Sequence, residues 1–263
     1  MSLSVLPALT RVYLVALAAL LGLVMGSALN CLAFRLARGE KWSGGRSACP
    51  MCGHTLSAAD LVPLFSWLFL RGRCRYCGGR VSARYPLTEL CLGVVFAALL
   101  LRFGLTLQTI TAAVLCACLF CLSLVDLDTQ IIPDRFLIIP AAVRVAQLLW
   151  EGGLRGLWRG LWPALVLGVG VLLLVLLMDK VLKKESMGGG DIKLFAMLGL
   201  WFSFPCCLLL LIASCVFGLV LAAATAGMKR DTPFPFGPAI SAAAFVCLLV
   251  GQPVVSWYLG LFL

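Results

Sequence analysis

The sequence predicts an all-α protein: a polytopic membrane helix bundle of about eight spans with a small cytoplasmic zinc-binding insert. Of the 263 residues, 62% are hydrophobic and only 12% are charged, and the mean hydropathy is +1.07. Soluble domains need a more highly charged surface. Apolar runs of about 20 residues, the length that crosses a bilayer, recur along nearly the whole chain. Because these runs are continuous and do not alternate with polar residues, a helical bundle is favoured over an outer-membrane barrel.

Eight apolar segments are candidate spans, separated by glycine, proline or charged residues. They cover residues 8–34, 87–104, 105–125, 134–150, 161–180, 191–204, 205–228 and 237–261. Only the short sequences "RFG" and "SFP" separate two of the pairs, so six or seven spans fit the pattern as well. Three domains follow: a first transmembrane span at 1–34, an insert at 35–86 and a transmembrane core at 87–263.

The insert at 35–86 is strongly basic and should lie in the cytoplasm, because Lys and Arg collect on that side of a membrane. It has only two acids, Glu40 and Asp60. Its nine basic residues are Arg35, Arg38, Lys41, Arg46, Arg71, Arg73, Arg75, Arg80 and Arg84. The chain carries a net charge of +10, but no basic region has the interleaved aromatics of a nucleic-acid-binding motif. We therefore expect membrane lipids and no nucleic acid as partners.

Two cysteine pairs in the insert predict a metal site. "CPMCGH" supplies Cys49 and Cys52, and "CRYCGG" supplies Cys74 and Cys77. Each CxxC turn directs two sulfurs at one point, and two turns provide the four thiolates of a closed, structural zinc site. A reducing cytoplasm favours metal over disulfides at this spacing. Two metal-free redox pairs are the alternative, and His54, the only histidine, is a possible substitute for one thiolate or a bystander.

Two groups of acids stand out in the apolar part of the chain. "SLVDLDTQIIPD" contains Asp126, Asp128 and Asp134, and "GGGD" ends in Asp191. The predicted topology places both groups at the same membrane face, where acids are costly and usually functional. Helix capping suits Asp134 and could suit Asp191. Capping does not account for the three preceding glycines, which allow another chain to approach closely.

The residues of the apolar segments allow few kinds of catalytic site. The sequence has no HExxH, GxSxG or Walker motif, and its only histidine lies in the insert. Two carboxyl groups that meet across helices need neither histidine nor metal, because close like charges share one proton. The ionised group takes a proton from water while the protonated group polarises a carbonyl. This arrangement predicts peptide hydrolysis of the aspartic-protease kind.

The chain resembles the type IV prepilin peptidase family, the bacterial leader peptidases and N-methyltransferases of pili and type II secretion. Five motifs occur in the family's order over nearly the whole chain. They are "GSALNCLAFRL", the cysteine insert that ends in "RYPLTEL", "LVDLDTQIIPD", the GxGD box "MGGGDIKLFAMLG" and "PFPFGPAIS". Two departures from the family pattern are small: Ala28 replaces a bulkier residue, and Gly189 fills the variable position of GxGD.

The resemblance implies that Asp191 is one catalytic acid and that its partner is the aspartate seven residues before Pro133, which is Asp126. Asp128 is the near competitor. Residues two apart on a helix are about 200° apart, so Asp126 and Asp128 cannot both face Asp191.

The resemblance also implies the reaction. A membrane aspartic endopeptidase of the bacterial inner membrane would remove the short basic leader of prepilins or pseudopilins on the cytoplasmic side. It would then N-methylate the new N-terminal residue with S-adenosylmethionine as methyl donor. The acids Glu40 and Asp60 could guide the basic leader. Two other classes of protein fit the residues when the family resemblance is set aside. One is a proton-coupled transporter that uses intramembrane aspartates. The other is an assembly scaffold that is stabilised by zinc and has no catalytic activity.

Overall fold

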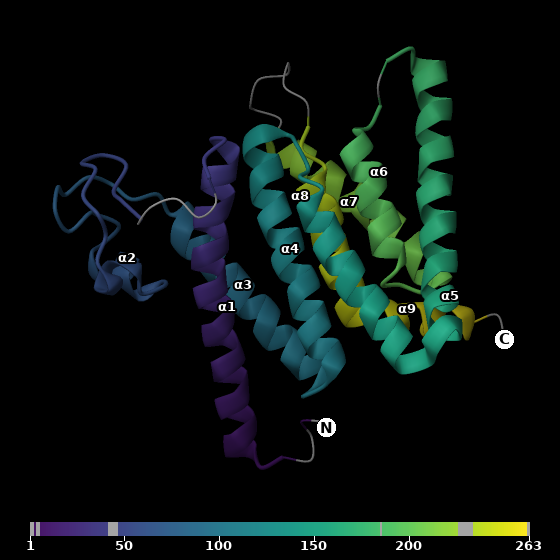
Figure 1. Cartoon of the computed structure of the whole chain (residues 1–263), viewed down its shortest axis with the longest axis horizontal. Coiled ribbons are helices and arrows are strands. Elements are labelled where there is room, and N and C mark those ends of the chain that lie inside the picture. The colour runs from purple at the N-terminus through teal and green to yellow at the C-terminus, as the bar shows by residue number, and fades with distance from the viewer. Residues whose placement is uncertain (1–2, 4–5, 42–46, 185, 226–233, 262–263) are drawn as a thin grey trace. The chain divides into compact units, whose positions relative to one another are not determined.

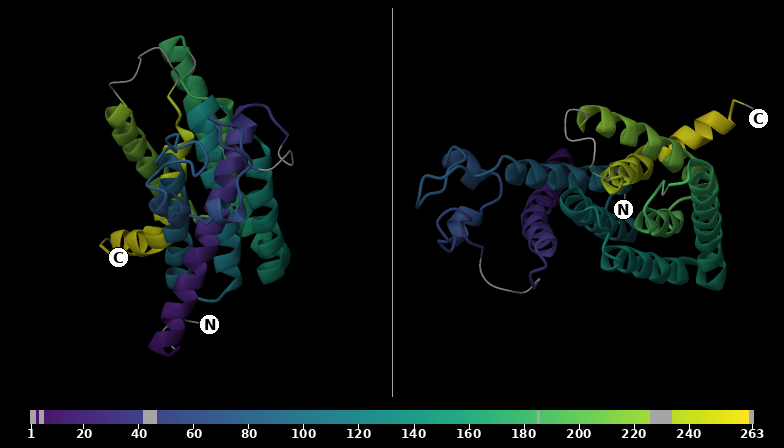
Figure 2. Two further views of the ribbon diagram at one scale, coloured as in Figure 1. Left: turned by 90° about the vertical axis from the view of Figure 1, so that its left-hand side faces the viewer. Right: turned by 90° about the horizontal axis from the view of Figure 1, so that it is seen from above.

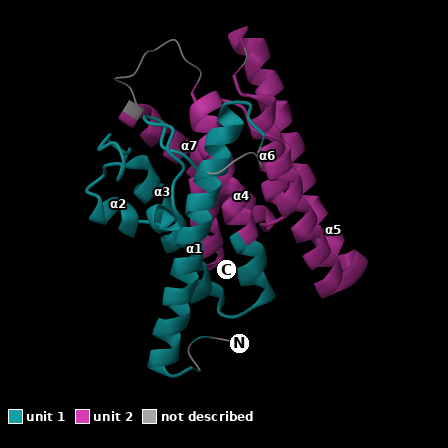
Figure 3. Cartoon of the chain, turned by 60° about the vertical axis from the view of Figure 1, so that its left-hand side comes forward, with its two compact units in different colours: residues 1–113 teal, residues 114–263 magenta. Residues whose placement is uncertain are grey.

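The computed structural model describes residues 3, 6–41, 47–184, 186–225 and 234–261 (Figure 1). Arg46 of the basic insert and Pro233 of the last motif lie outside these residues. The chain forms two compact units, residues 1–113 and 114–263, coloured separately in Figure 3. The described residues are mainly helical, which confirms the predicted all-α class.

The first unit is built on a pair of long helices, α1 (Ala8–Ala37) and α3 (Arg84–Phe103). Gly22 and Gly26 of α1 are buried against α3. A Cβ atom on Gly22 would lie 2.5 Å from the Leu92 carbonyl oxygen, so only glycine allows this approach of the two backbones. Small residues at helix contacts are typical of membrane proteins, where close van der Waals packing drives association.

Between these helices, the described residues of the insert form two short helical elements, η2 (Ala58–Leu61) and α2 (Phe65–Phe69). Leu64, which precedes α2, has a φ of 63°. Its N–H donates a 2.7 Å hydrogen bond to Glu89, whose side chain is buried on α3. This bond fixes a backbone conformation that leucine rarely adopts and ties the insert to α3.

The second unit holds most of α4 (Leu107–Thr129) and the long helix α5 (Arg135–Leu182). The 48 residues of α5 are interrupted at Gly153, which has φ 57° and ψ −145°. We call the two parts the first limb (135–152) and the second limb (154–182). They correspond to the predicted spans 134–150 and 161–180, and Figure 2 shows them at an angle to each other.

The C-terminal part of this unit supplies two further candidate spans. One is α7 (Phe204–Thr225). The other is a continuous helical stretch of α8 (Gly237–Val246), a π-helical turn η3 (Cys247–Gly251) and α9 (Gln252–Leu259). In the described part of the chain, six helices are long and apolar enough to cross a membrane, with both limbs of α5 counted as one.

The predicted span at 191–204 contains a helix that is too short to cross the membrane. It contains helix α6 (Gly189–Gly199) of only 11 residues. At a rise of 1.5 Å per residue this helix is about 16 Å long, whereas the hydrocarbon core is about 30 Å thick. Helix α6 is nevertheless deeply packed, with Leu194 and Leu198 fully buried. It lies in the angle between the two limbs of α5 (Figure 2).

Candidate functional site

Asp126 lies in the last turn of α4 and is only 4% exposed. Its Oδ2 atom accepts a 2.9 Å hydrogen bond from the N–H of Gly237, the first residue of α8. A Cβ atom on residue 237 would lie 2.8 Å from that oxygen, so glycine is required for the contact. The N-terminal end of a helix carries partial positive charge, and this hydrogen bond therefore favours the ionised form of Asp126.

Asp191 lies in the first turn of α6 and is half-buried. Its carboxyl group is close enough to that of Asp126 for the two charges to interact. The structure thus places near each other two acids that are far apart in the sequence. The N-cap residue of α6 is Gly188, which has no side chain, so Asp191 does not act as the N-cap.

The glycines before Asp191 have different surroundings. A Cβ atom on Gly190 would lie 3.0 Å from Cβ of Ile132, in the connection between α4 and α5. This confirms the prediction that the glycines allow close approach of another segment. A Cβ atom on Gly188 would lie 3.5 Å from Asp191 Oδ2, and one on Gly189 would meet open space.

Asp128 and Asp134, the other two acids of the first motif, have surroundings different from those of Asp126. Asp128 is exposed, whereas Asp126 is buried, as expected for residues on different faces of one helix. Asp134 precedes α5 but makes no capping hydrogen bond, so the capping prediction is wrong. Its carboxylate instead forms a 2.8 Å ion pair with Lys193 of α6. The α4–α5 connection is therefore attached to the helix that carries Asp191.

The four predicted metal ligands form one cluster in the first unit. The Sγ atoms of Cys49, Cys52, Cys74 and Cys77 all lie within 4.8 Å of one another. Zinc–sulfur bonds of about 2.3 Å in a tetrahedron place sulfurs about 3.8 Å apart, and the Cys49 and Cys77 sulfurs are 3.9 Å apart. The donor set and its spacing fit a zinc ion.

Each half of the cluster is the same small backbone hairpin. The N–H of Cys49 donates to the His54 carbonyl, and the N–H of Cys74 donates to the Gly79 carbonyl. Both turns need a glycine with positive φ, Gly53 at 71° and Gly78 at 68°. Backbone N–H groups of Cys52 and Met51 lower the pKa of Cys49 to about 7. A lowered pKa favours the thiolate, which is the form that binds metal.

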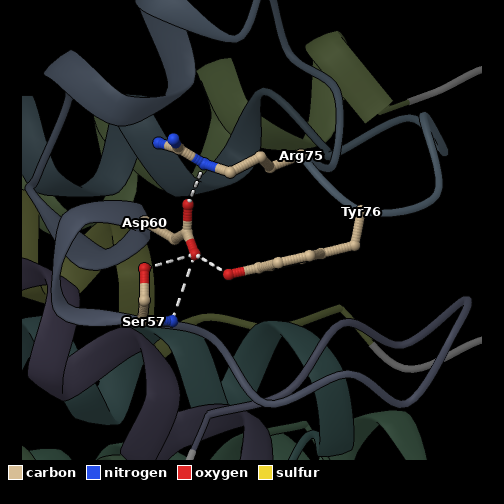
Figure 4. Close-up of polar contacts among 4 residues, drawn as sticks. All are labelled: Ser57, Asp60, Arg75 and Tyr76. Carbon is tan, nitrogen blue, oxygen red and sulfur yellow. Dashed lines mark hydrogen bonds and ion pairs between the residues drawn. The ribbon is translucent and has the colours of Figure 1, made fainter.

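Asp60 joins the second cysteine pair to the rest of the insert (Figure 4). Its carboxylate accepts hydrogen bonds from the backbone and hydroxyl of Ser57, from Arg75 Nε at 2.7 Å and from the Tyr76 hydroxyl at 3.0 Å. The Ser57 hydroxyl, together with these other donors, holds the pKa of Asp60 well below its usual range. The Asp60 side chain is only 4% exposed, so it is a structural anchor and not a free charge for a basic leader.

His54 is placed by aromatic packing. Its ring centroid lies 3.7 Å from that of Tyr76, whose hydroxyl contacts Asp60. Among the described residues, the metal-binding group consists of the four cysteines. His54 therefore supports the cluster from outside, in line with the bystander alternative.

Comparison with known proteins relates both units to one family. Residues 20–103 match the bacterial peptidase A24 N-terminal domain, and residues 113–223 match the type IV leader peptidase family. A prepilin leader peptidase/N-methyltransferase of Bacillus subtilis is 33% identical over 247 residues, which cover 90% of this chain and 95% of that protein. The chain belongs to the type IV leader peptidase family.

Two further relatives of the type IV leader peptidase family carry the same name. The protein of Stutzerimonas stutzeri is 37% identical over 81% of this chain and 74% of its own length. That of Aeromonas hydrophila is 36% identical over 83% of this chain and 76% of its own length. No solved structure gives a significant match.

The two family matches include most of the site residues but not all of them. The N-terminal match contains the four cysteines, and the leader peptidase match contains Asp126 and Asp191. Gly237 lies beyond the end of the second match at residue 223. Sequence reasoning gave Gly237 no role, although the motif "PFPFGPAIS" that contains it was recognisable.

Proposed function

We propose that the protein is a membrane aspartic endopeptidase that removes the short basic leader of type IV prepilins or pseudopilins. It then N-methylates the new N-terminal residue. The observation that carries this proposal is the convergence of Asp126 and Asp191, whose charges interact across two helices. The relationship to named prepilin leader peptidase/N-methyltransferases, which extends over most of the chain, supports both activities.

The environments of the two acids support different roles. Asp126 accepts the Gly237 N–H at the start of α8, and it is the ionised group that takes a proton from the attacking water. Asp191 is the protonated group that donates its proton to the carbonyl oxygen of the scissile bond. The water oxygen bonds to the carbonyl carbon and gives a tetrahedral intermediate with two hydroxyl groups. The carbon–nitrogen bond then breaks as Asp126 passes its proton to the leaving nitrogen and Asp191 takes one back from a hydroxyl group, which restores both acids to their starting states.

Two further groups belong to the proposal. Cys49, Cys52, Cys74 and Cys77 would hold a structural zinc ion, which joins the two hairpins of an insert that has little core of its own. S-adenosylmethionine would supply the methyl group. The sequence has no glycine-rich nucleotide-binding motif, and the methyl donor therefore rests on the family relationship alone.

We place the protein in the bacterial inner membrane with the site facing the cytoplasm. The supporting observations are the six apolar helices and the excess of basic residues in the insert at 35–86. The proposed domains remain the first span at 1–34, the zinc insert at 35–86 and the peptidase core at 87–263. Pili or type II secretion would be the systems served.

Purified protein in liposomes should shorten a prepilin by its leader and transfer a labelled methyl group from S-adenosylmethionine to the new N-terminus. Mass spectrometry of the product measures both events. If the prepilin stays intact, the peptidase hypothesis is rejected, and the transporter and scaffold hypotheses remain. Cleaved but unlabelled pilin would reject the methyltransferase alone.

Gly237→Ala should impair cleavage although residue 237 does not react. The new Cβ atom would lie 2.8 Å from Oδ2 and 3.2 Å from Cγ of Asp126. Either the carboxylate or α8 must move, and a displacement of about 1 Å can cost about 100-fold in rate. We expect kcat to fall about 10- to 100-fold. Gly170→Ala is the matched control, because a Cβ atom there meets open space; equal rates for both variants would contradict the proposed contact.

A further inference from the structure

Arg144 is a charged residue in the middle of the first limb of α5. This limb is the first part of α5, a helix long and apolar enough to cross a membrane. The Nε atom of Arg144 donates a 3.2 Å hydrogen bond to the carbonyl oxygen of Leu200, the residue that ends α6. Ionisable residues inside a membrane segment are costly and usually functional, yet neither proposed activity uses this arginine.

The guanidinium group of Arg144 is held by several partners in the same unit. Its Nη1 atom donates a 2.9 Å hydrogen bond to Oε1 of Gln147, which is itself buried. Gln147 in turn donates to the carboxylate of Glu151 at 2.9 Å. The guanidinium carbon lies 5.3 Å from the Trp201 ring centroid. The arginine therefore has a fixed position at the end of α6.

The contact with Leu200 suits the electrostatics of a short helix. The C-terminal end of a helix carries partial negative charge and exposes carbonyl groups without partners in the helix. Helix α6 ends inside the protein, where water does not satisfy these groups. Arg144 supplies both a hydrogen-bond donor and a positive charge at this end.

Helix α6 is attached to the first limb of α5 at two points along its length. Near its middle, Lys193 pairs with Asp134, which directly precedes the limb. Just after its end, Leu200 accepts the hydrogen bond of Arg144. The two elements therefore run side by side in the same direction. The ion pair of Lys193 is exposed, and exposed ion pairs contribute little, so the attachment at Arg144 is the stronger one.

The second limb of α5 restrains α6 in a different way. Gly199 packs directly on the backbone of Ala164, and Gly168 faces Ala196, where a Cβ atom would lie 2.8 Å from the Ala196 side chain. These contacts set the lateral distance between the helices. In the part of the chain that the structure describes, these are packing contacts between small residues, whereas Arg144 adds a directional hydrogen bond at the end of α6.

We propose that Arg144 is a positioning residue that fixes α6 along its axis and thereby holds Asp191 opposite Asp126. Asp191 lies nine residues from Leu200, about 14 Å along a helix, so Arg144 acts through the helix and touches no reacting atom. The inference rests on the proposed peptidase function.

Arg144→Met should lower kcat for prepilin cleavage about 10- to 100-fold, because a small shift of Asp191 misaligns the acids. KM should stay within about twofold, since substrate contacts are kept. Arg144→Lys retains the charge and one donor and should recover part of the lost kcat. Methylation of pre-cleaved pilin should be unaffected. Arg155→Met, an exposed arginine of the same helix, is the matched control and should behave as wild type.

A wild-type kcat for Arg144→Met, or a raised KM with unchanged kcat, would overturn the assignment. If that variant does not accumulate in membranes, Gln147→Met, which removes the buried hydrogen-bond partner of Arg144, takes its place, and a wild-type kcat there has the same meaning.

Disulfide crosslinking, which does not depend on catalysis, tests the positioning role of Arg144 separately from the proposed function. In an Asp126→Cys, Asp191→Cys background, oxidation should link the two positions, as peptide mass spectrometry would measure. Adding Arg144→Met should reduce the yield of this link. An unchanged yield overturns the positioning role even if the protein proves not to be a peptidase, whereas loss of prepilin cleavage by wild type rejects only the proposed function.

Discussion

Replacing either Asp126 or Asp191 with asparagine is expected to abolish prepilin cleavage. Asparagine has nearly the same shape as aspartate but cannot accept a proton from water or donate one to a carbonyl. A positioned proton-transfer group contributes about 100- to 10,000-fold, so each single variant should lose at least about 100-fold in kcat. The measurement is the rate of leader removal by purified variants at saturating prepilin.

The double variant should be little worse than either single variant, because the two carboxyl groups act as a unit. Asp128→Asn is the control, since Asp128 is exposed two residues from the buried Asp126. If the Asp128 variant lost activity while the Asp126 variant cleaved normally, the proposed pair of acids would be wrong.

Cys74→Ser is expected to remove the metal and disrupt the insert. Wild-type protein should contain about one zinc ion per chain, and a site reduced to three thiolates should retain little of it after purification. The cluster joins the two hairpins of an insert that contains only short helices among its described residues, so metal loss should expose the insert to proteases. Elemental analysis and limited proteolysis measure these two effects.

Cys91→Ser is the matched control for the zinc prediction, because Cys91 is an exposed thiol on α3 outside the cluster. It should keep both the metal and the protease resistance. Zinc-free wild-type protein with an intact insert would show that the four cysteines do not form a structural metal site.

Hydropathy and local spacing made much of this fold predictable. A membrane helix needs a continuous apolar run of fixed length, which the sequence displays directly. Likewise, two CxxC turns bring four sulfurs together by local geometry, and the structure places Cys49, Cys52, Cys74 and Cys77 in one cluster. The pairing of Asp126 with Asp191 followed from family motifs and from the shared membrane face, both of which are visible in the sequence.

The features that could not be predicted depend on contacts between distant residues. The apolar run from 191 to 204 continues beyond Gly199, where α6 ends, so hydropathy alone does not mark the end of this helix. Asp60 looked like a solvated charge because its donors Arg75 and Tyr76 lie 15 and 16 residues away.

The roles of Gly237 and Arg144 could not be predicted for the same reason. Their partners, Asp126 and Leu200, are 111 and 56 residues distant. Nothing in the neighbourhood of either residue indicates which carboxylate or carbonyl it will meet. Only the folded structure reveals both contacts.

The hydrogen bond from Gly237 to Asp126 makes the two acids chemically unequal before any substrate arrives. In the proposed mechanism Asp126 takes a proton during turnover, and the amide of Gly237 then favours release of that proton. The backbone of α8 would thus return the two acids to their starting charge state after each peptide. An inhibitor that carries a single hydroxyl group between the acids should consequently bind in only one orientation.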